Sequence, residues 1–161
     1  MTARINGLFH IAIKTIDLKA TLKFYEDVLG LVQVARPNFG FPGAWLASSS
    51  LNGGTIIHVY AGGPALGSHG GPLEGSAAID HISLACSGFH AFRERFQSAQ
   101  LPWRENLVPG TSLWQLFVYD PSAIMLELTF EGSTEAGALP NMQKGWAYVA
   151  GESFYEKPQV R

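Results

Sequence analysis

The chain has 161 residues, of which 47 % are hydrophobic and 15 % are charged, and its formal net charge is −2. This composition supports a sizeable buried core and excludes intrinsic disorder, while the small net charge argues against binding to nucleic acid or to an anionic membrane. No stretch approaches the ~20 apolar residues of a membrane span and no signal peptide is visible, so we expect a cytoplasmic protein.

The first part of the chain predicts the order strand, helix, strand, strand, strand. Asp17 is a candidate N-cap, apolar residues then recur at helical spacing, and Gly30 is a candidate stop. Turn-forming residues occupy positions 37–42 and Asn52–Gly53. We therefore assign residues 6–61 to a first βαβββ module. Its predicted strands cover residues 7–14, 31–36, 43–49 and 55–61.

A glycine-rich linker of residues 62–77 is followed by the same order of elements. Phe89, Phe92 and Phe96 recur at three- and four-residue spacing, which predicts an amphipathic helix over residues 89–99. A turn at residues 120–123 separates the last two strands. The sequence thus predicts a second βαβββ module over residues 78–131. Its predicted strands cover residues 78–86, 102–108, 112–119 and 124–130.

Residues 132–161 form a C-terminal tail without a clear period. The tail carries the aromatic residues Trp146, Tyr148, Phe154 and Tyr155, which is too many for a plain disordered segment. We expect it to fold back over the core or to pack against a partner subunit. Cys86, the single cysteine, permits no internal disulfide, which fits a reducing compartment. Because it lies in an apolar run, we interpret it as a packing residue.

Three pairs of residues recur at nearly one offset, which indicates an internal repeat. His10 and His81 are 71 positions apart, and each lies in the middle of a predicted strand. His58 and Glu127 are 69 positions apart, as are Trp45 and Trp114. Two unrelated hairpin-rich stretches are the alternative interpretation.

Four polar residues lie inside the predicted apolar strands, where an unpaired polar group is costly to bury. They are His10, His58, His81 and Glu127. Each histidine alone is more often a core residue that bonds to the backbone. If the two halves pack about a pseudo-twofold axis, however, all four side chains converge. Imidazole and carboxylate donors suit one divalent metal ion, Fe²⁺, Zn²⁺, Mn²⁺, Ni²⁺ or Co²⁺. The other two histidines, His69 and His90, are expected at the surface.

The arrangement over residues 6–131 resembles the vicinal oxygen chelate superfamily, which includes glyoxalase I, extradiol dioxygenases, methylmalonyl-CoA epimerase and fosfomycin-resistance enzymes. The resemblance implies an α+β fold in which tandem βαβββ modules pair into a curved mixed-sheet barrel around a metal site. The residues that carry it are the His10 strand, Phe24-Tyr25 with Leu29-Gly30-Leu31, His81 in DHISL, and Asp120-Pro121-Ser122 with Glu127 in YDPSAIMLEL.

Carried over by position, the resemblance implies that His10, His81 and Glu127 are metal ligands. Position 58 separates the branches, because bacterial-type glyoxalase I has a glutamate there and the epimerase a glutamine. Extradiol dioxygenases place a catalytic, non-ligating histidine on the corresponding strand, but they also carry a tyrosine where this chain has Phe117. His58 is therefore expected either as a fourth ligand, which we favour, or as an acid–base residue.

The resemblance implies a metal-dependent dioxygenase, or a lyase or isomerase, that chelates a small oxygen-rich substrate and forms a homodimer. His58 and Glu127 are the candidate catalytic residues. Phe39, Trp45, Trp103 and Trp114 are candidate substrate-binding residues, with core packing as the alternative for each. Two other functions stay open. One is a metal-free, bleomycin-resistance-like ligand-binding protein. The other is a fosfomycin-type thiol transferase. The sequence shows no obvious basic loop for a phosphonate, but Lys14, Arg36 and Arg104 could contribute to binding one.

Overall fold

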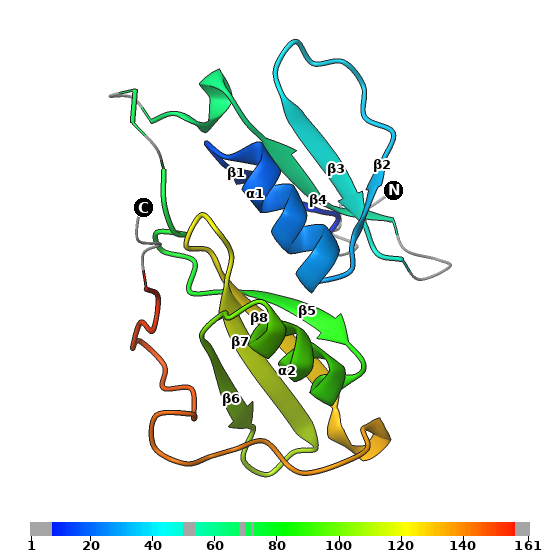
Figure 1. Ribbon diagram of the computed structural model, residues 1–161, viewed down its shortest axis with the longest axis vertical. Coiled ribbons are helices and arrows are strands. Elements are labelled where there is room, and N and C mark those ends of the chain that lie inside the picture. The colour runs from blue at the N-terminus through cyan, green and yellow to red at the C-terminus, as the bar shows by residue number, and fades with distance from the viewer. Residues whose placement is uncertain (1–7, 50–53, 68–69, 72, 157–161) are drawn as a thin grey trace, which may run out of the picture. The chain divides into compact units, whose positions relative to one another are not determined.

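The computed structural model describes residues 8–49, 54–67, 70–71 and 73–156 (Figure 1). The chain forms two compact units, a first unit of residues 1–73 and a second unit of residues 74–161. The predicted turn at Asn52–Gly53 and His69 lie outside the described residues. None of the described helices is both long and apolar enough to cross a membrane.

The first unit is a four-stranded mixed sheet with one helix. The strand order is β1-β4-β3-β2, with β1 parallel to β4 and the other neighbours antiparallel. A π-helical turn, η1, continues helix α1 directly, and a short 3₁₀ turn, η2, follows the last strand. The elements are β1 (Ile11–Lys14), α1 (Leu18–Lys23), η1 (Phe24–Val28), β2 (Val32–Val34), β3 (Gly43–Ala47), β4 (Thr55–Tyr60) and η2 (Gly63–Ala65).

The second unit repeats this topology. Its strand order is β5-β8-β7-β6, again with the first strand parallel to the last. The prediction of an α+β fold built from tandem βαβββ modules is confirmed. The elements are β5 (Ile82–Cys86), α2 (Phe89–Ser98), β6 (Trp103–Leu107), β7 (Leu113–Tyr119), β8 (Met125–Glu131) and the 3₁₀ turn η3 (Gly132–Thr134).

Both ends of the first helical segment form as the sequence predicts. The side chain of Asp17 accepts a hydrogen bond from the Ala20 amide at 2.9 Å, which satisfies one of the free amides of the first turn. Gly30 follows η1 with a φ of 76°, a conformation that residues with a Cβ atom rarely adopt. The π-helical geometry of η1 itself is not evident from the sequence.

The first strand of each unit is shorter than predicted, which corrects the placement of two histidines. β1 begins at Ile11 and β5 at Ile82, so His10 and His81 immediately precede their strands. The reason is the extent of pairing, because the parallel ladders begin at Ile11 with Ile57 and at Ile82 with Leu126. Each histidine is therefore held at a strand end, with one neighbour in the ladder and one outside it.

The strand register confirms two of the three predicted equivalences. Ala12 pairs with His58 in the first unit, and Ser83 pairs with Glu127 in the second. His10 and His81 thus precede equivalent strands, and His58 and Glu127 occupy equivalent positions. The third equivalence is wrong, because Trp45 pairs with His58 whereas the residue that pairs with Glu127 is Phe117. Phe117 is the structural counterpart of Trp45.

The second sheet presents two chemically different faces. Since side chains alternate along a strand, residues 114 and 117 point to opposite sides. On the α2 face, the ring of Trp114 lies 5.2 Å from Phe89 and that of Trp103 lies 6.2 Å from Phe96. The opposite face, here called the Glu127 face, carries Ser83, Phe117, Glu127 and Thr129. Trp103 and Trp114 therefore pack against α2, which favours the core-packing alternative for both residues.

Residues 132–156 of the tail fold back over the second unit, which confirms one of the two predicted alternatives (Figure 1). Ala147 forms a parallel bridge to Glu105 of β6. The Glu105 amide donates to the Trp146 carbonyl, and the Tyr148 amide donates to the Glu105 carbonyl, both at 2.8 Å. The aromatic rings of Trp146 and Tyr148 cover Trp103 and Phe117 respectively. The tail therefore contributes to both faces of the second sheet.

Glu105 connects α2, β6 and the tail through one fully buried carboxylate. Its Oε1 lies 3.0 Å from Nε of Arg93 and accepts from the Trp103 indole at 3.1 Å. Its Oε2 accepts from the Asn141 amide at 2.7 Å. A buried charge needs this degree of compensation, because carboxylates are rarely buried without partners.

We expect Glu105→Gln to lower the free energy of unfolding by about 2 kcal/mol. Removing one partner of a buried ion pair costs up to ~5 kcal/mol, and the value is smaller here because Arg93 is 30 % exposed. Urea unfolding measures the loss, and limited proteolysis should show faster cleavage of the tail. Glu94→Gln, an exposed change next to Arg93 on helix α2, is the matched control. Equal behaviour of the two variants would contradict this role for Glu105.

Candidate functional site

In the first unit, the rings of His10 and Trp45 both stack on His58. The rings of His10 and His58 have centroids 3.8 Å apart, and the rings of Trp45 and His58 have centroids 4.4 Å apart with an interplanar angle of 9°. The Trp45–His58 contact follows from their direct pairing across β3 and β4. His58 alternates with the buried residues Ile57 and Val59, so its side chain points away from theirs. The structure thus brings together three of the predicted site residues.

An arginine and two phenylalanines extend this stack. The Phe39 ring lies 6.1 Å from Trp45 and 6.0 Å from Phe41. The guanidinium carbon of Arg36 is 4.8 Å from the centroid of each phenylalanine ring. Phe39 is 49 % exposed, so it is placed to contact a ligand as well as its neighbours.

The environment of His58 favours its neutral form. Burial lowers the pKa of this imidazole, and the positive charges of His10 and Arg36 lower it further. A neutral imidazole is the form that both a metal ligand and a general base require. The two predicted roles of His58 are therefore both compatible with its surroundings.

Glu127 is the central acidic group of the second unit. It is only 7 % exposed, and its Oε1 accepts hydrogen bonds from the hydroxyls of Ser83 at 2.6 Å and Thr129 at 2.5 Å. Its Oε2 lies 3.2 Å from Nε2 of His81. Two neutral donors therefore fix one oxygen, which leaves the other oxygen turned toward an imidazole.

His81 is held from its other side by Asp80 and the tail. Its Nδ1 lies 2.7 Å from Oδ1 of Asp80, which also accepts a hydrogen bond from the Tyr148 hydroxyl at 3.1 Å. The ring of Tyr148 stacks on Phe117, with centroids 3.7 Å apart. Burial first, and then the bond to Asp80, raise the pKa of Tyr148 to about 12, so the phenol keeps its proton. The hydrogen bond from His81 holds the pKa of Asp80 below its ordinary value.

A carboxylate on Nδ1 fixes the orientation of an imidazole and leaves Nε2 free for a second partner. Sequence reasoning identified His81 and Glu127 but missed Asp80, Tyr148, Ser83 and Thr129. The adjacency of Asp80 to His81 was an available signal. For Tyr148 the sequence held no signal beyond the aromatic character of the tail, because this residue contacts Asp80 only once the chain has folded.

Two predicted metal donors lie together in each unit, His10 with His58 and His81 with Glu127. Over the described part of the chain, no group of three or more His, Cys, Asp or Glu side chains is gathered closely enough to hold a metal ion. The convergence of all four donors on one ion stays a prediction.

Cys86 and His90 lie outside these clusters. Cys86 is half-buried at the end of β5, and burial together with the charge of Glu135 raises the pKa of its thiol to about 12. The unreactive thiol form dominates at neutral pH, as expected of a packing residue. His90 is also half-buried, on α2, and an added Cβ at Gly137 would lie 2.6 Å from its Nε2. His90 is therefore packed beneath the tail, where a surface position was expected.

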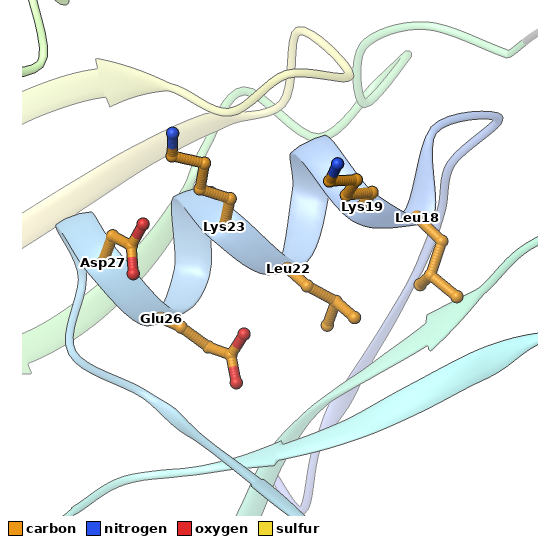
Figure 2. Close-up of a pocket in the computed structure, with 6 residues that line it drawn as sticks. All are labelled: Leu18, Lys19, Leu22, Lys23, Glu26 and Asp27. Carbon is orange, nitrogen blue, oxygen red and sulfur yellow. The ribbon is translucent and has the colours of Figure 1, made fainter.

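Two hollows accompany these elements. A shallow one follows the surface of α1 and is lined by Leu18, Lys19, Leu22, Lys23, Glu26 and Asp27 (Figure 2). It contains none of the predicted site residues. The second, of about 360 Å³, is lined by Asp80, Tyr119 and tail residues that include Ser153. It gives access to the carboxylate that holds His81.

Comparison with known proteins places this chain in a family. The sequence profile of the Glyoxalase/Bleomycin resistance protein/Dioxygenase superfamily matches residues 7–128. Glyoxylase I 4 of Arabidopsis thaliana is 25 % identical over 131 residues, covering 77 % of this chain and 70 % of that protein.

Solved structures share the fold at lower sequence identity. The genomically encoded fosfomycin resistance protein FosX from Listeria monocytogenes superposes with a TM-score of 0.59 at 17 % identity, over 79 % of this chain and 94 % of that one. Lactoylglutathione lyase from Agrobacterium tumefaciens gives a TM-score of 0.58 at 15 % identity, over 81 % and 98 % of the two chains. With a profile match over most of its length and a repeated βαβββ topology, the chain belongs to the glyoxalase/bleomycin resistance protein/dioxygenase superfamily.

Proposed function

We propose that this protein is a divalent-metal-dependent enzyme of the vicinal oxygen chelate type, acting on a small oxygen-rich substrate. The observation that carries the proposal is the arrangement of His81 and Glu127. Asp80 orients the imidazole, and a buried carboxylate oxygen faces its Nε2 at 3.2 Å. A buried carboxylate whose second oxygen meets only an imidazole is a typical ligand environment for a divalent cation.

The donor set fits such an ion. Glu127 supplies a carboxylate and His10, His58 and His81 supply imidazoles, and Nδ1 of His10 is buried without a hydrogen-bond partner among the described residues. His10, His81 and Glu127 would hold the ion, with His58 as the fourth ligand. When bound, a divalent ion supplies Lewis acidity toward two neighbouring oxygens of a substrate.

The chain's own residues prepare the site in three ways. Ser83 and Thr129 immobilise Oε1 of Glu127, so the carboxylate cannot rotate freely. The Trp45 ring covers one face of His58 and keeps it in a dry environment that favours the neutral base. The Tyr148 phenol retains its proton above Phe117, so it can donate a hydrogen bond to Asp80 or to a substrate oxygen.

His58 decides the branch of chemistry. As a fourth ligand it favours lyase or isomerase chemistry, in which Glu127 moves a proton between neighbouring carbons. As an acid–base residue beside a three-ligand ion it favours the dioxygenase branch. A metal-free ligand-binding protein is the alternative if no ion binds. The resemblance further implies a homodimer, which sedimentation velocity at micromolar concentration would detect.

We expect one equivalent of divalent metal per chain and a graded response to histidine substitution. His10→Ala should weaken the binding of Zn²⁺ or Fe²⁺ by about 100-fold or more, because it removes a direct ligand. His58→Ala should have a comparable effect if it is also a ligand. Isothermal titration calorimetry with each metal ion, after chelator treatment, measures both the stoichiometry and the affinities.

His90→Ala is the matched control, because this histidine lies on α2 and packs beneath the tail. If His58→Ala keeps full affinity while His10→Ala loses it, His58 is an acid–base residue and the dioxygenase branch gains. The enzyme proposal is wrong if the unaltered chain binds none of the ions Fe²⁺, Mn²⁺, Zn²⁺ and Ni²⁺.

The Asp80 carboxylate is expected to tune His81 as a metal ligand. Asp80→Asn should lower metal affinity by roughly 10-fold, as loss of such an orienting carboxylate does in other metal sites. Tyr148→Phe removes a weaker, 3.1 Å bond to the same oxygen and should cost a few-fold at most. The same calorimetric titration ranks the two variants, with Glu152→Gln in the exposed tail as control. A larger loss for Tyr148→Phe than for Asp80→Asn would show that the tail acts by another route.

A further inference from the structure

Arg36 carries hydrogen-bond donors that have no acceptor in the described part of the chain. Its Nε and Nη2 atoms are both buried and both without a hydrogen-bond partner. These two nitrogens form one edge of the guanidinium, where their N–H bonds point in parallel. That edge is the fork that binds two oxygens of one carboxylate or phosphonate group at once. A cationic fork buried without an acceptor is costly, so the conformation is favourable only when an acceptor enters.

Aromatic packing by itself does not account for the empty fork. Arg93 and Arg104 also lie over phenylalanine rings, at 5.9 Å and 4.7 Å from the centroids. Arg93 bonds through Nε to Glu105, and Arg104 donates through Nη1 to the Trp103 carbonyl. Ring contact is therefore combined with a polar partner at both of these arginines. Arg36 has the ring contacts, to Phe39 and Phe41, without the partner.

A glycine and an exposed aromatic ring border the fork. An added Cβ at Gly43 would lie 3.3 Å from Nη2 of Arg36 and 2.2 Å from the Val59 carbonyl oxygen, so any side chain there would crowd the fork. Phe39, which covers the guanidinium, is 49 % exposed and belongs to no strand, so its ring can move without breaking a ladder. A ligand can therefore reach the fork by displacing one ring.

A further donor of the same aromatic cluster lacks an acceptor. The indole Nε1 of Trp45 is buried without a hydrogen-bond partner. Trp45 contacts both Phe39 and His58, and the charge of Arg36 is felt at His58. The cluster thus gathers N–H groups with no described oxygen to receive them, which is the complement of an oxygen-rich anion.

We propose that Arg36 binds an oxyanion of the substrate, a carboxylate or a phosphonate, through its Nε and Nη2 fork, with Phe39 and Trp45 packing against the attached carbon skeleton. The proposal rests on the proposed function, since it assigns a substrate class to that site. It narrows the oxygen-rich substrate to a small organic anion with an apolar or aromatic body.

The test uses the full chain and three probes of one shape that differ in charge. Benzoate represents the carboxylate, phenylphosphonate the phosphonate, and benzamide is the neutral counterpart of benzoate. Calorimetry or arginine Nε–H NMR shifts at pH 7.5 should show an anion binding at least 10-fold more tightly than benzamide. Arg36→Met should remove this preference, and Arg95→Met, which also loses an arginine stacked on phenylalanine, should keep it. The stronger of the two anions identifies the oxyanion.

Equal binding of benzoate, phenylphosphonate and benzamide to the unaltered chain would overturn the proposal, as would unchanged anion affinity in Arg36→Met. If Arg36→Met fails to fold by circular dichroism, Arg36→Lys takes its place and should lose most of the bidentate affinity while keeping the charge. Titration with Zn²⁺ alone separates the two proposals. If the chain binds the anion but no metal, the proposed enzyme function is wrong and the Arg36 site is supported. If it binds the metal but shows no preference for the anion, only the Arg36 proposal is wrong.

Discussion

Parallel pairing of the first and last strands is the constraint on which both modules depend. In each unit the helix carries the chain to the far edge of the sheet, and the antiparallel strands then lead back until the last strand lies beside the first. The pairing of Ala12 with His58 and of Ser83 with Glu127 then places the residue before the first strand next to a polar position of the last strand. Because side chains alternate, that polar position faces away from the apolar core. The His10–His58 stack and the His81–Glu127 pair are both products of this one register.

The second unit buries two carboxylates and compensates them in different ways. Glu105 meets an arginine, an indole and a backbone amide, so its charge is balanced within the fold and it serves to anchor the tail. Glu127 meets two hydroxyls at Oε1 and one imidazole nitrogen at Oε2, and none of these groups brings a permanent positive charge. In a medium of low polarity the charge of Glu105 is already balanced by Arg93, whereas the charge of Glu127 favours the addition of a cation. This contrast is the physical basis for the structural role of Glu105 and for the proposed metal-binding role of Glu127.

The two units differ most in what covers their polar faces. In the first, Arg36, Phe39 and Trp45 surround His58 with aromatic surface and unpaired donors. In the second, the tail brings Tyr148 over Phe117 and ties its hydroxyl to Asp80. The first unit is thus suited to recognising an anionic, partly apolar group, and the second to fixing the geometry of its donor pair. One repeated topology thus carries two polar faces that are built from different residues.

The sequence by itself determined the repeated order of elements and the caps at Asp17 and Gly30, because these depend on local periodicity. It also determined the polar positions His10, His58, His81 and Glu127, because these recur at a nearly constant offset between the two halves. It misplaced the equivalence of Trp45 with Trp114, since a shift of register by an odd number of residues moves a side chain to the other face and leaves composition unchanged. Only the tertiary structure decided that Phe117 pairs with Glu127, that Trp103 and Trp114 pack against α2, and that Tyr148 reaches Asp80. Contacts between residues as distant as Asp80 and Tyr148 follow from how the tail closes on β6, and no pattern within a short window of sequence encodes that closure.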